Sequence, residues 1–171
     1  NDCSPGKYST TNAGNSVETK CKECAVDTYS TQERRVTACG NCDDGKHTNT
    51  ETGATTCEAC AAGEKQIVGT DGLRVCEDCP AGRISSVGVT SCDICGKGLY
   101  ANAATKATSC ISCDAGKYND QNSQNSVTSP CKNCLAGRYS SATGVVSVDG
   151  CNDCSPGKYS TTNDGNSVET K

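Results

Sequence analysis

The chain lacks most of the large apolar side chains from which globular proteins build a core. It contains no Phe, Trp or Met and only six Tyr among 171 residues. Burial of apolar surface contributes roughly 25 cal/mol per Å², whereas ordering a residue costs on the order of 1–2 kcal/mol in backbone entropy. We therefore expect a minimal hydrophobic core and a covalent source of stability.

Further absences narrow the functions that the chain can have. The net charge is −4 and the basic residues are scattered singly, which leaves no positive patch for nucleic acid or an anionic membrane. No apolar run approaches the roughly 18–20 residues of a membrane span. The only histidine is His47, and no glycine-rich phosphate loop follows a strand. We predict a protein that is not an enzyme, has no cofactor or bound metal, and makes no nucleic-acid or membrane contact through these residues.

Cysteine is abundant, and its density indicates the compartment. Seventeen cysteines in 171 residues are typical of a disulfide scaffold formed under oxidising conditions. The sequence therefore predicts an extracellular or cell-surface protein.

The chain repeats on two scales. Residues 1–20 return at 152–171 with one difference, Ala13 against Asp164, so residues 1–151 form one super-repeat and 152–171 begin the next. Within it, pairs of the form C-x-x-C delimit modules of about 19 residues. Modules 1 to 8 start near residues 3, 24, 42, 60, 79, 95, 113 and 134, and module 9 starts at Cys154. Repeats of this kind indicate a chain built from stacked units.

Each module has a readable internal pattern. Three residues after the starting Cys stands Gly in all modules except module 2, which has Asp27, and Tyr follows two residues later in six modules. The exceptions at the Tyr position are His47, Lys65 and Ile84, and we interpret His47 as a substituted packing residue. The Gly permits a left-handed turn into a short strand, and a small apolar residue before the next Cys, such as Ala54 or Val89, is expected to face the Tyr across the hairpin. No segment shows helical periodicity, and a lone two-stranded hairpin is marginal, so disulfides must close each module.

The spacing of the cysteines favours a serial pairing. If the second Cys of each C-x-x-C pair bonds the first Cys of the next, the bridges are Cys3–Cys21, Cys24–Cys39, Cys42–Cys57, Cys60–Cys76, Cys79–Cys92, Cys95–Cys110, Cys113–Cys131 and Cys134–Cys151. Cys154 would pair with a cysteine beyond the segment, where the repeat places one. Crossed bridges between neighbouring pairs are the alternative, because spacing alone does not determine connectivity. A four-cysteine zinc site also matches the pairs formally, but an even array of eight pairs would need an arbitrary grouping.

The pattern C-x-x-C-x-x-G-x-Y, as in CNDCSPGKYSTT, CKNCLAGRYSS and CISCDAGKYND, resembles the cysteine-rich repeat named after ephrin receptors. It is also similar to the first small module of tumour-necrosis-factor-receptor repeats. The resemblance implies elongated extracellular rods of stacked disulfide hairpins with the serial pairing. Long uninterrupted arrays of the module resemble the surface coat antigens of ciliates and the filamentous hairs (mastigonemes) of flagella.

Together these observations predict a small disulfide-rich β fold: an elongated, solenoid-like rod of disulfide-closed β-hairpin modules without helices. The expected function is structural, as a repeating segment of a self-associating extracellular filament, flagellar hair or surface coat. The alternative is a receptor or adhesion ectodomain, with the divergent residues 63–75 as its ligand-binding module. No N-x-S/T sequon occurs, so any glycans are expected to be O-linked on loop hydroxyls. The candidates are Thr10, Thr11, Ser140 and Ser141.

Overall fold

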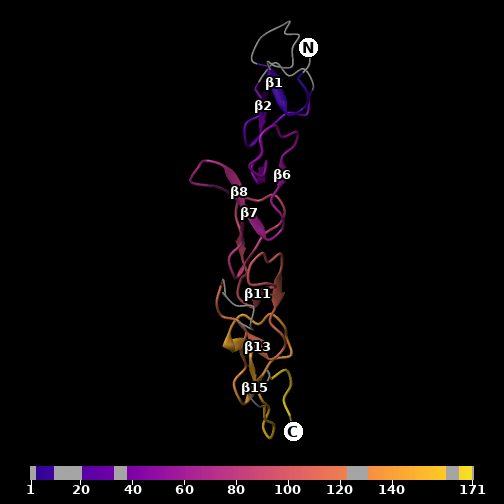
Figure 1. Ribbon diagram of the computed structural model, residues 1–171. Helices are drawn as coiled ribbons and strands as arrows, with labels where there is room; N and C mark the ends of the chain where they lie inside the picture. The colour runs from indigo at the N-terminus through magenta and orange to yellow at the C-terminus, as the bar shows by residue number, and fades with distance from the viewer. Residues whose placement is uncertain (1–2, 10–20, 33–37, 123–130, 161–165, 171) are drawn as a thin grey trace. The chain divides into compact units, whose positions relative to one another are not determined.

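The computed structural model describes residues 3–9, 21–32, 38–122, 131–160 and 166–170. The chain, coloured from its N- to its C-terminus in Figure 1, divides into two compact units, one of Asn1–Glu77 with Ser86–Ser91 and one of Asp78–Ser85 with Cys92–Lys171. The loop of module 5 belongs to the first unit because it packs on module 4. The Gly88 N–H donates to the Cys60 carbonyl at 2.9 Å, and the Gln66 N–H donates to the Val89 carbonyl at 2.8 Å.

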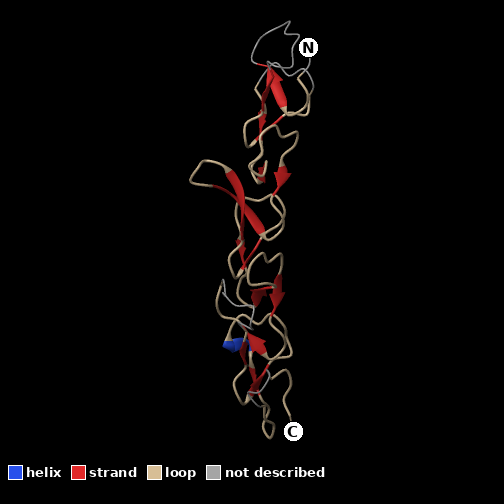
Figure 2. Ribbon diagram, viewed as in Figure 1, coloured by secondary structure: helices blue, strands red, loops and turns tan. Residues whose placement is uncertain are grey.

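The strands are short and each sheet has only two of them (Figure 2). In the first unit the pairs are β1 (Lys7–Ser9) with β2 (Cys21–Glu23), β3 (Thr28–Tyr29) with β4 (Gly40–Asn41), β5 (Lys46–His47) with β6 (Glu58–Ala59), and β7 (Glu64–Val68) with β8 (Arg74–Asp78), whose last residue belongs to the second unit. In the second unit they are β9 (Arg83–Ile84) with β10 (Asp93–Ile94), β11 (Leu99–Ala101) with β12 (Cys110–Ser112), β13 (Lys117–Tyr118) with β14 (Lys132–Asn133), and β15 (Arg138–Tyr139) with β16 (Asn152–Asp153). The described residues contain no α-helix, and one 3-10 turn, η2 (Val148–Gly150), precedes Cys151.

A tight turn at the start of each module directs the chain into its first strand. In every module the carbonyl of the residue after the Cys accepts a hydrogen bond from the residue after the Gly; in module 1 the Lys7 N–H reaches the Ser4 carbonyl at 3.1 Å. Gly6 sits third in that turn with φ +83°, after Pro5, as a type II turn requires. Asp27 replaces the Gly in module 2 and also has a positive φ, +62°. The prediction that the residue at the Gly position takes a left-handed conformation and turns the chain into a short strand is therefore confirmed.

The second strand of the hairpin is not where the sequence pattern placed it. The Tyr position pairs with the residue directly after the first Cys of the next C-x-x-C pair, as Tyr8 with Lys22 and Tyr139 with Asn152. The prediction that the apolar residue before the next Cys faces the Tyr across the hairpin was therefore wrong. Instead, the backbone of that apolar residue bonds the preceding module: the Ala54 carbonyl accepts from the Ser30 N–H at 3.1 Å. The strand pairs therefore use the C-x-x-C residues, which leaves the loop of each module to contact its neighbour.

The buried apolar residues are few and small. Among the described residues they are ten cysteines and two alanines. One cluster gathers Cys95, Ala101 and Ala107 with partly buried neighbours that include Ile84 and Leu99. The expected minimal core is thus present, and the disulfides occupy the place that aliphatic side chains fill in larger domains.

Candidate functional site: the module joints and the His47 group

Consecutive modules are joined by a recurring set of backbone hydrogen bonds, which we call the joint. The N–H at the Gly position donates to the residue that follows the Tyr position in the next module, as Gly6 to the Ser30 carbonyl and Gly116 to the Ser140 carbonyl, at 2.8 and 2.7 Å. In return, the loop of the next module donates to the starting Cys, as Gly144 to the Cys113 carbonyl at 2.8 Å. Each joint therefore satisfies polar backbone groups that would otherwise be buried without partners.

The residue after the Tyr position is the buried centre of the joint. Described residues at this position that are buried are Ser30, Thr48, Gln66, Ser85, Ala101, Asn119, Ser140 and Ser160. Several of their side chains bond the preceding module: the Thr48 hydroxyl accepts from the Asp27 N–H at 2.9 Å, and Gln66 Oε1 accepts from the Gly45 N–H at 3.1 Å. A contact between modules was not predicted at this position, although its uniformly small or amide side chains are a visible signal in the sequence.

Asn119 shows how strongly such a side chain is held. It is fully buried, its Nδ2 donates to the Leu99 carbonyl at 2.8 Å, and its Oδ1 accepts from the Gln121 N–H at 3.1 Å. Removal of one partner from a buried hydrogen bond costs about 1–3 kcal/mol. We expect Asn119→Ala to lower the free energy of unfolding of the second unit by about 2–3 kcal/mol, measured by denaturant titration with the disulfides intact. Asn152→Ala, on an exposed strand residue, is the matched control and should change stability by less than about 0.5 kcal/mol; equal losses would contradict the assigned role.

Modules two apart also touch within each unit. A β-carbon at Gly6, Gly45 or Gly98 would lie 1.9–2.2 Å from the carbonyl oxygen of a loop glycine two modules later, namely Gly53, Gly88 or Gly144. In module 2 the carboxylate of Asp27 makes the equivalent contact and accepts from the Arg74 N–H of module 4 at 2.7 Å. The Arg74 guanidinium also donates to Asp44 at 3.2 Å, which attaches the divergent β7–β8 hairpin to module 3. Contact between modules two apart therefore recurs at this position in modules 1, 2, 3 and 6.

The disulfides follow the serial order. The structure joins Cys3–Cys21, Cys24–Cys39, Cys42–Cys57, Cys60–Cys76, Cys79–Cys92, Cys95–Cys110, Cys113–Cys131 and Cys134–Cys151. Each bridge spans 13–18 residues, and none of them is crossed. Cys154 is a half-buried free thiol, so its pairing with a cysteine outside the segment stays a prediction.

The glycosylation candidates differ in their accessibility. Ser140 is 2% exposed and lies inside a joint, so its hydroxyl is not accessible to a glycosyltransferase in the folded chain. Ser141 beside it is exposed, whereas Thr10 and Thr11 lie outside the described residues. Ser141 is therefore the accessible candidate of the two that the structure describes.

Ion pairs lie on the exposed surface of the modules. Lys132 Nζ lies 2.8 Å from Asp120 Oδ1, and this hydrogen bond holds the pKa of the Asp120 carboxyl below its usual range. The pKa of Lys132 is raised by the same bond. Its ammonium also lies 5.9 Å from the centre of the Tyr118 ring. Because these groups face solvent, their attraction is screened and the pair is a small contributor to stability.

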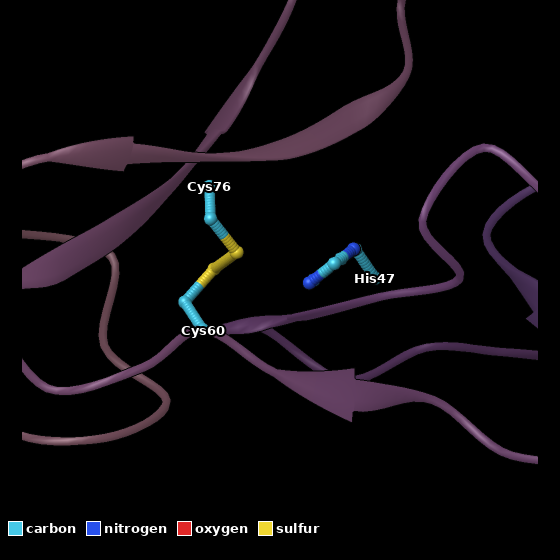
Figure 3. A group of neighbouring side chains, drawn as sticks. All are labelled: His47, Cys60 and Cys76. Carbon is cyan, nitrogen blue, oxygen red and sulfur yellow. A yellow bond between two sulfur atoms is a disulfide. The ribbon is translucent and has the colours of Figure 1, made fainter.

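His47 lies against the disulfide of the next module. Its imidazole and the sulfur atoms of Cys60 and Cys76 lie within 4.8 Å of one another (Figure 3). The group borders a cavity of about 360 Å³ that is also lined by Thr50, Glu64 and others. Three such ligand types could in principle hold a metal, but zinc binds thiolates, and here both sulfurs are consumed in the Cys60–Cys76 bridge. In this oxidised state the group is a histidine packed on a disulfide.

Comparison with known proteins adds no relative. Neither the protein-family models nor the curated proteins searched contain a match to this chain. Within the part of the chain that the structure describes, no helix has the length and apolar character needed to cross a membrane.

Proposed function

We propose that this chain is a repeating structural segment of an extracellular filament, flagellar hair or cell-surface coat. The observation that supports it most is the serial contact pattern, in which modules 1 to 8 are each closed by their own disulfide and hydrogen bonds of the joint recur between consecutive modules. A unit of this kind continues in one direction for as long as the sequence repeats. The return of residues 1–20 at 152–171 supplies such a repeat.

Two further features support this role. The polar joints and the disulfides replace a hydrophobic core, so the segment can lengthen without enclosing a larger interior. The resemblance of its modules to ephrin-receptor-like repeats, and of the uninterrupted array to protist coat and hair proteins, points to the same use. Eight disulfides are consistent with an oxidising, extracellular location, and a non-catalytic role fits the absence of any catalytic constellation in the sequence.

The test is to vary the number of repeats. Polypeptides with one, two and four copies of the 151-residue unit should show, by small-angle scattering and electron microscopy, a rod whose length rises by a constant increment per copy. Sedimentation at increasing concentration should then reveal association into longer or thicker filaments. Compact particles at every copy number would refute the rod, and rods that stay monomeric would refute the filament.

The receptor or adhesion alternative has one supporting feature, the β7–β8 hairpin. Its five-residue strands are the longest among the described residues, and Val68 near its tip is 64% exposed. A pull-down of a soluble partner that is lost when the tip at residues 69–72 is replaced, while the rest of the chain stays folded, would favour this alternative over the structural role.

A further inference from the structure

The Cys60–Cys76 disulfide has the only histidine of the chain beside it. His47 occupies the Tyr position of module 3, and its ring lies edge-on with one nitrogen directed toward the two sulfur atoms (Figure 3). In all eight bridges the starting cysteine of the module is buried. Burial of the starting cysteine therefore does not set Cys60–Cys76 apart, whereas the neighbouring histidine does.

The local backbone favours one tautomer of the neutral imidazole. The Asn49 N–H donates to His47 Nδ1 at 2.9 Å, so Nδ1 acts as an acceptor and the neutral ring carries its proton on Nε2. The turn that provides this donor is strained, since Asn49 and Thr50 both have left-handed conformations, with φ of +52° and +63°. For a β-branched residue such as Thr50 this is a genuine outlier, and outliers persist where the surroundings impose them.

The cavity gives a small molecule access to the bridge. Asn49, Thr50, Ala59 and Ala61 on its rim are exposed, while the disulfide lies at its wall. Cys60 is 1% exposed and Cys76 is half-buried. An incoming sulfur therefore reaches Cys76, and the Cys60 sulfur becomes the leaving group.

From this geometry we propose that Cys60–Cys76 is a site of thiol–disulfide exchange with small-molecule thiols, in which the Nε2–H of His47 stabilises the departing sulfur by a hydrogen bond. The attacking thiolate forms a new S–S bond to Cys76 as the old bond breaks, and the electron pair of that bond goes to Cys60. Nε2–H of His47 donates a hydrogen bond to the departing Cys60 thiolate, which then takes its proton from solvent. The products are a mixed disulfide on Cys76 and a free thiol on Cys60. A second thiol that attacks the mixed disulfide completes the two-electron reduction, so two thiols are oxidised to one disulfide.

The expected consequence is a hierarchy among the eight bridges. A hydrogen bond donated to the sulfur as it becomes anionic is charge-assisted and stabilises the transition state more than the intact disulfide. We therefore expect glutathione to open Cys60–Cys76 about tenfold faster than any other bridge, which corresponds to a barrier lower by about 1.4 kcal/mol. The inference does not depend on the filament role, because it concerns one module and one disulfide.

The experiment exposes the oxidised full chain to glutathione for short times, quenches with acid, alkylates free thiols and maps them by peptide mass spectrometry. The expected early products are glutathione on Cys76 and an alkylated Cys60. The control variant is His47→Tyr, which restores the residue used by six other modules and should slow the opening of Cys60–Cys76 to the rate of its neighbours. Unchanged rates in this variant, or uniform opening of all eight bridges in the original chain, would overturn the proposal.

A purely structural effect of the substitution has the opposite signature. If His47→Tyr merely loosened modules 3 and 4, Cys42–Cys57 and Cys60–Cys76 would both open faster. A selective decrease at Cys60–Cys76, with Cys42–Cys57 unchanged, is the outcome expected from loss of the imidazole N–H donor. A decrease at both bridges, which would indicate a general tightening of the fold, would count against the proposal.

Discussion

Reduction of the disulfides is expected to unfold the whole chain. The buried apolar residues described in the structure are ten cysteines and two alanines, so no aliphatic core remains once the bridges open. Each bridge closes a loop of 13–18 residues, and a loop of about 15 residues contributes roughly 3 kcal/mol in the chain-entropy model. Net stabilities of domains are only about 5–15 kcal/mol, so loss of eight such terms leaves nothing to hold the fold. The measurement is amide chemical-shift dispersion by NMR before and after reduction and alkylation.

A single-bridge variant shows whether this loss is local or global. Cys113→Ser with Cys131→Ser removes the bridge of module 7 and should abolish amide protection there and weaken it in the modules that form joints with module 7. Protection in modules 1 to 3 should stay unchanged, because contacts in a repeat stack run between near neighbours. Native dispersion in the fully reduced chain would show that the joints alone fold it, and uniform loss of protection in the single-bridge variant would contradict the modular picture.

Local features of the fold were predictable because adjacent residues determine them. The type II turn follows from a Gly three residues after the Cys, as in Ser4 to Lys7, since only a left-handed residue completes that turn. The serial order of the disulfides matches the alternation of short and long cysteine spacings, because a hairpin brings the two ends of one module together. The absence of helices among the described residues follows likewise from the lack of helical periodicity.

Features that depend on stacking were not predictable from one module. The apolar residue before the Cys was assigned to its own hairpin, whereas Ala54 bonds Ser30 of the preceding module. Ser140 was proposed as a glycosylation site because it lies in a Ser-rich loop, and only the joint reveals that it is buried. His47 was interpreted as a packing residue. Its closeness to the next module's disulfide could not be predicted, because the residue pattern within one module does not show which residues of neighbouring modules are in contact.

The contact between modules two apart is expected to make Gly98 one of the least replaceable residues. Gly98 has φ +75°, and a β-carbon there would lie 2.2 Å from the Gly144 carbonyl oxygen and 2.8 Å from its carbonyl carbon. Neither atom can shift easily, because both are backbone atoms and the Gly144 N–H donates a hydrogen bond to the Cys113 carbonyl. Left-handed backbone costs about 1–2 kcal/mol in a residue with a β-carbon, and overpacking adds about 1–3 kcal/mol. We expect Gly98→Ala to lower the free energy of unfolding by about 3–4 kcal/mol.

Gly137 is the matched control for this substitution, because it occupies the same module position with nearly the same conformation. Its φ is +78°, and a β-carbon there would meet nothing within 4 Å. Gly137→Ala should therefore cost only the backbone term, about 1–2 kcal/mol. Denaturant titration of both oxidised variants, with hydrogen exchange to locate the loss, isolates the contribution of the contact between modules 6 and 8. Equal losses in the two variants would mean that these modules do not touch in solution, and the stack would then depend on joints between consecutive modules alone.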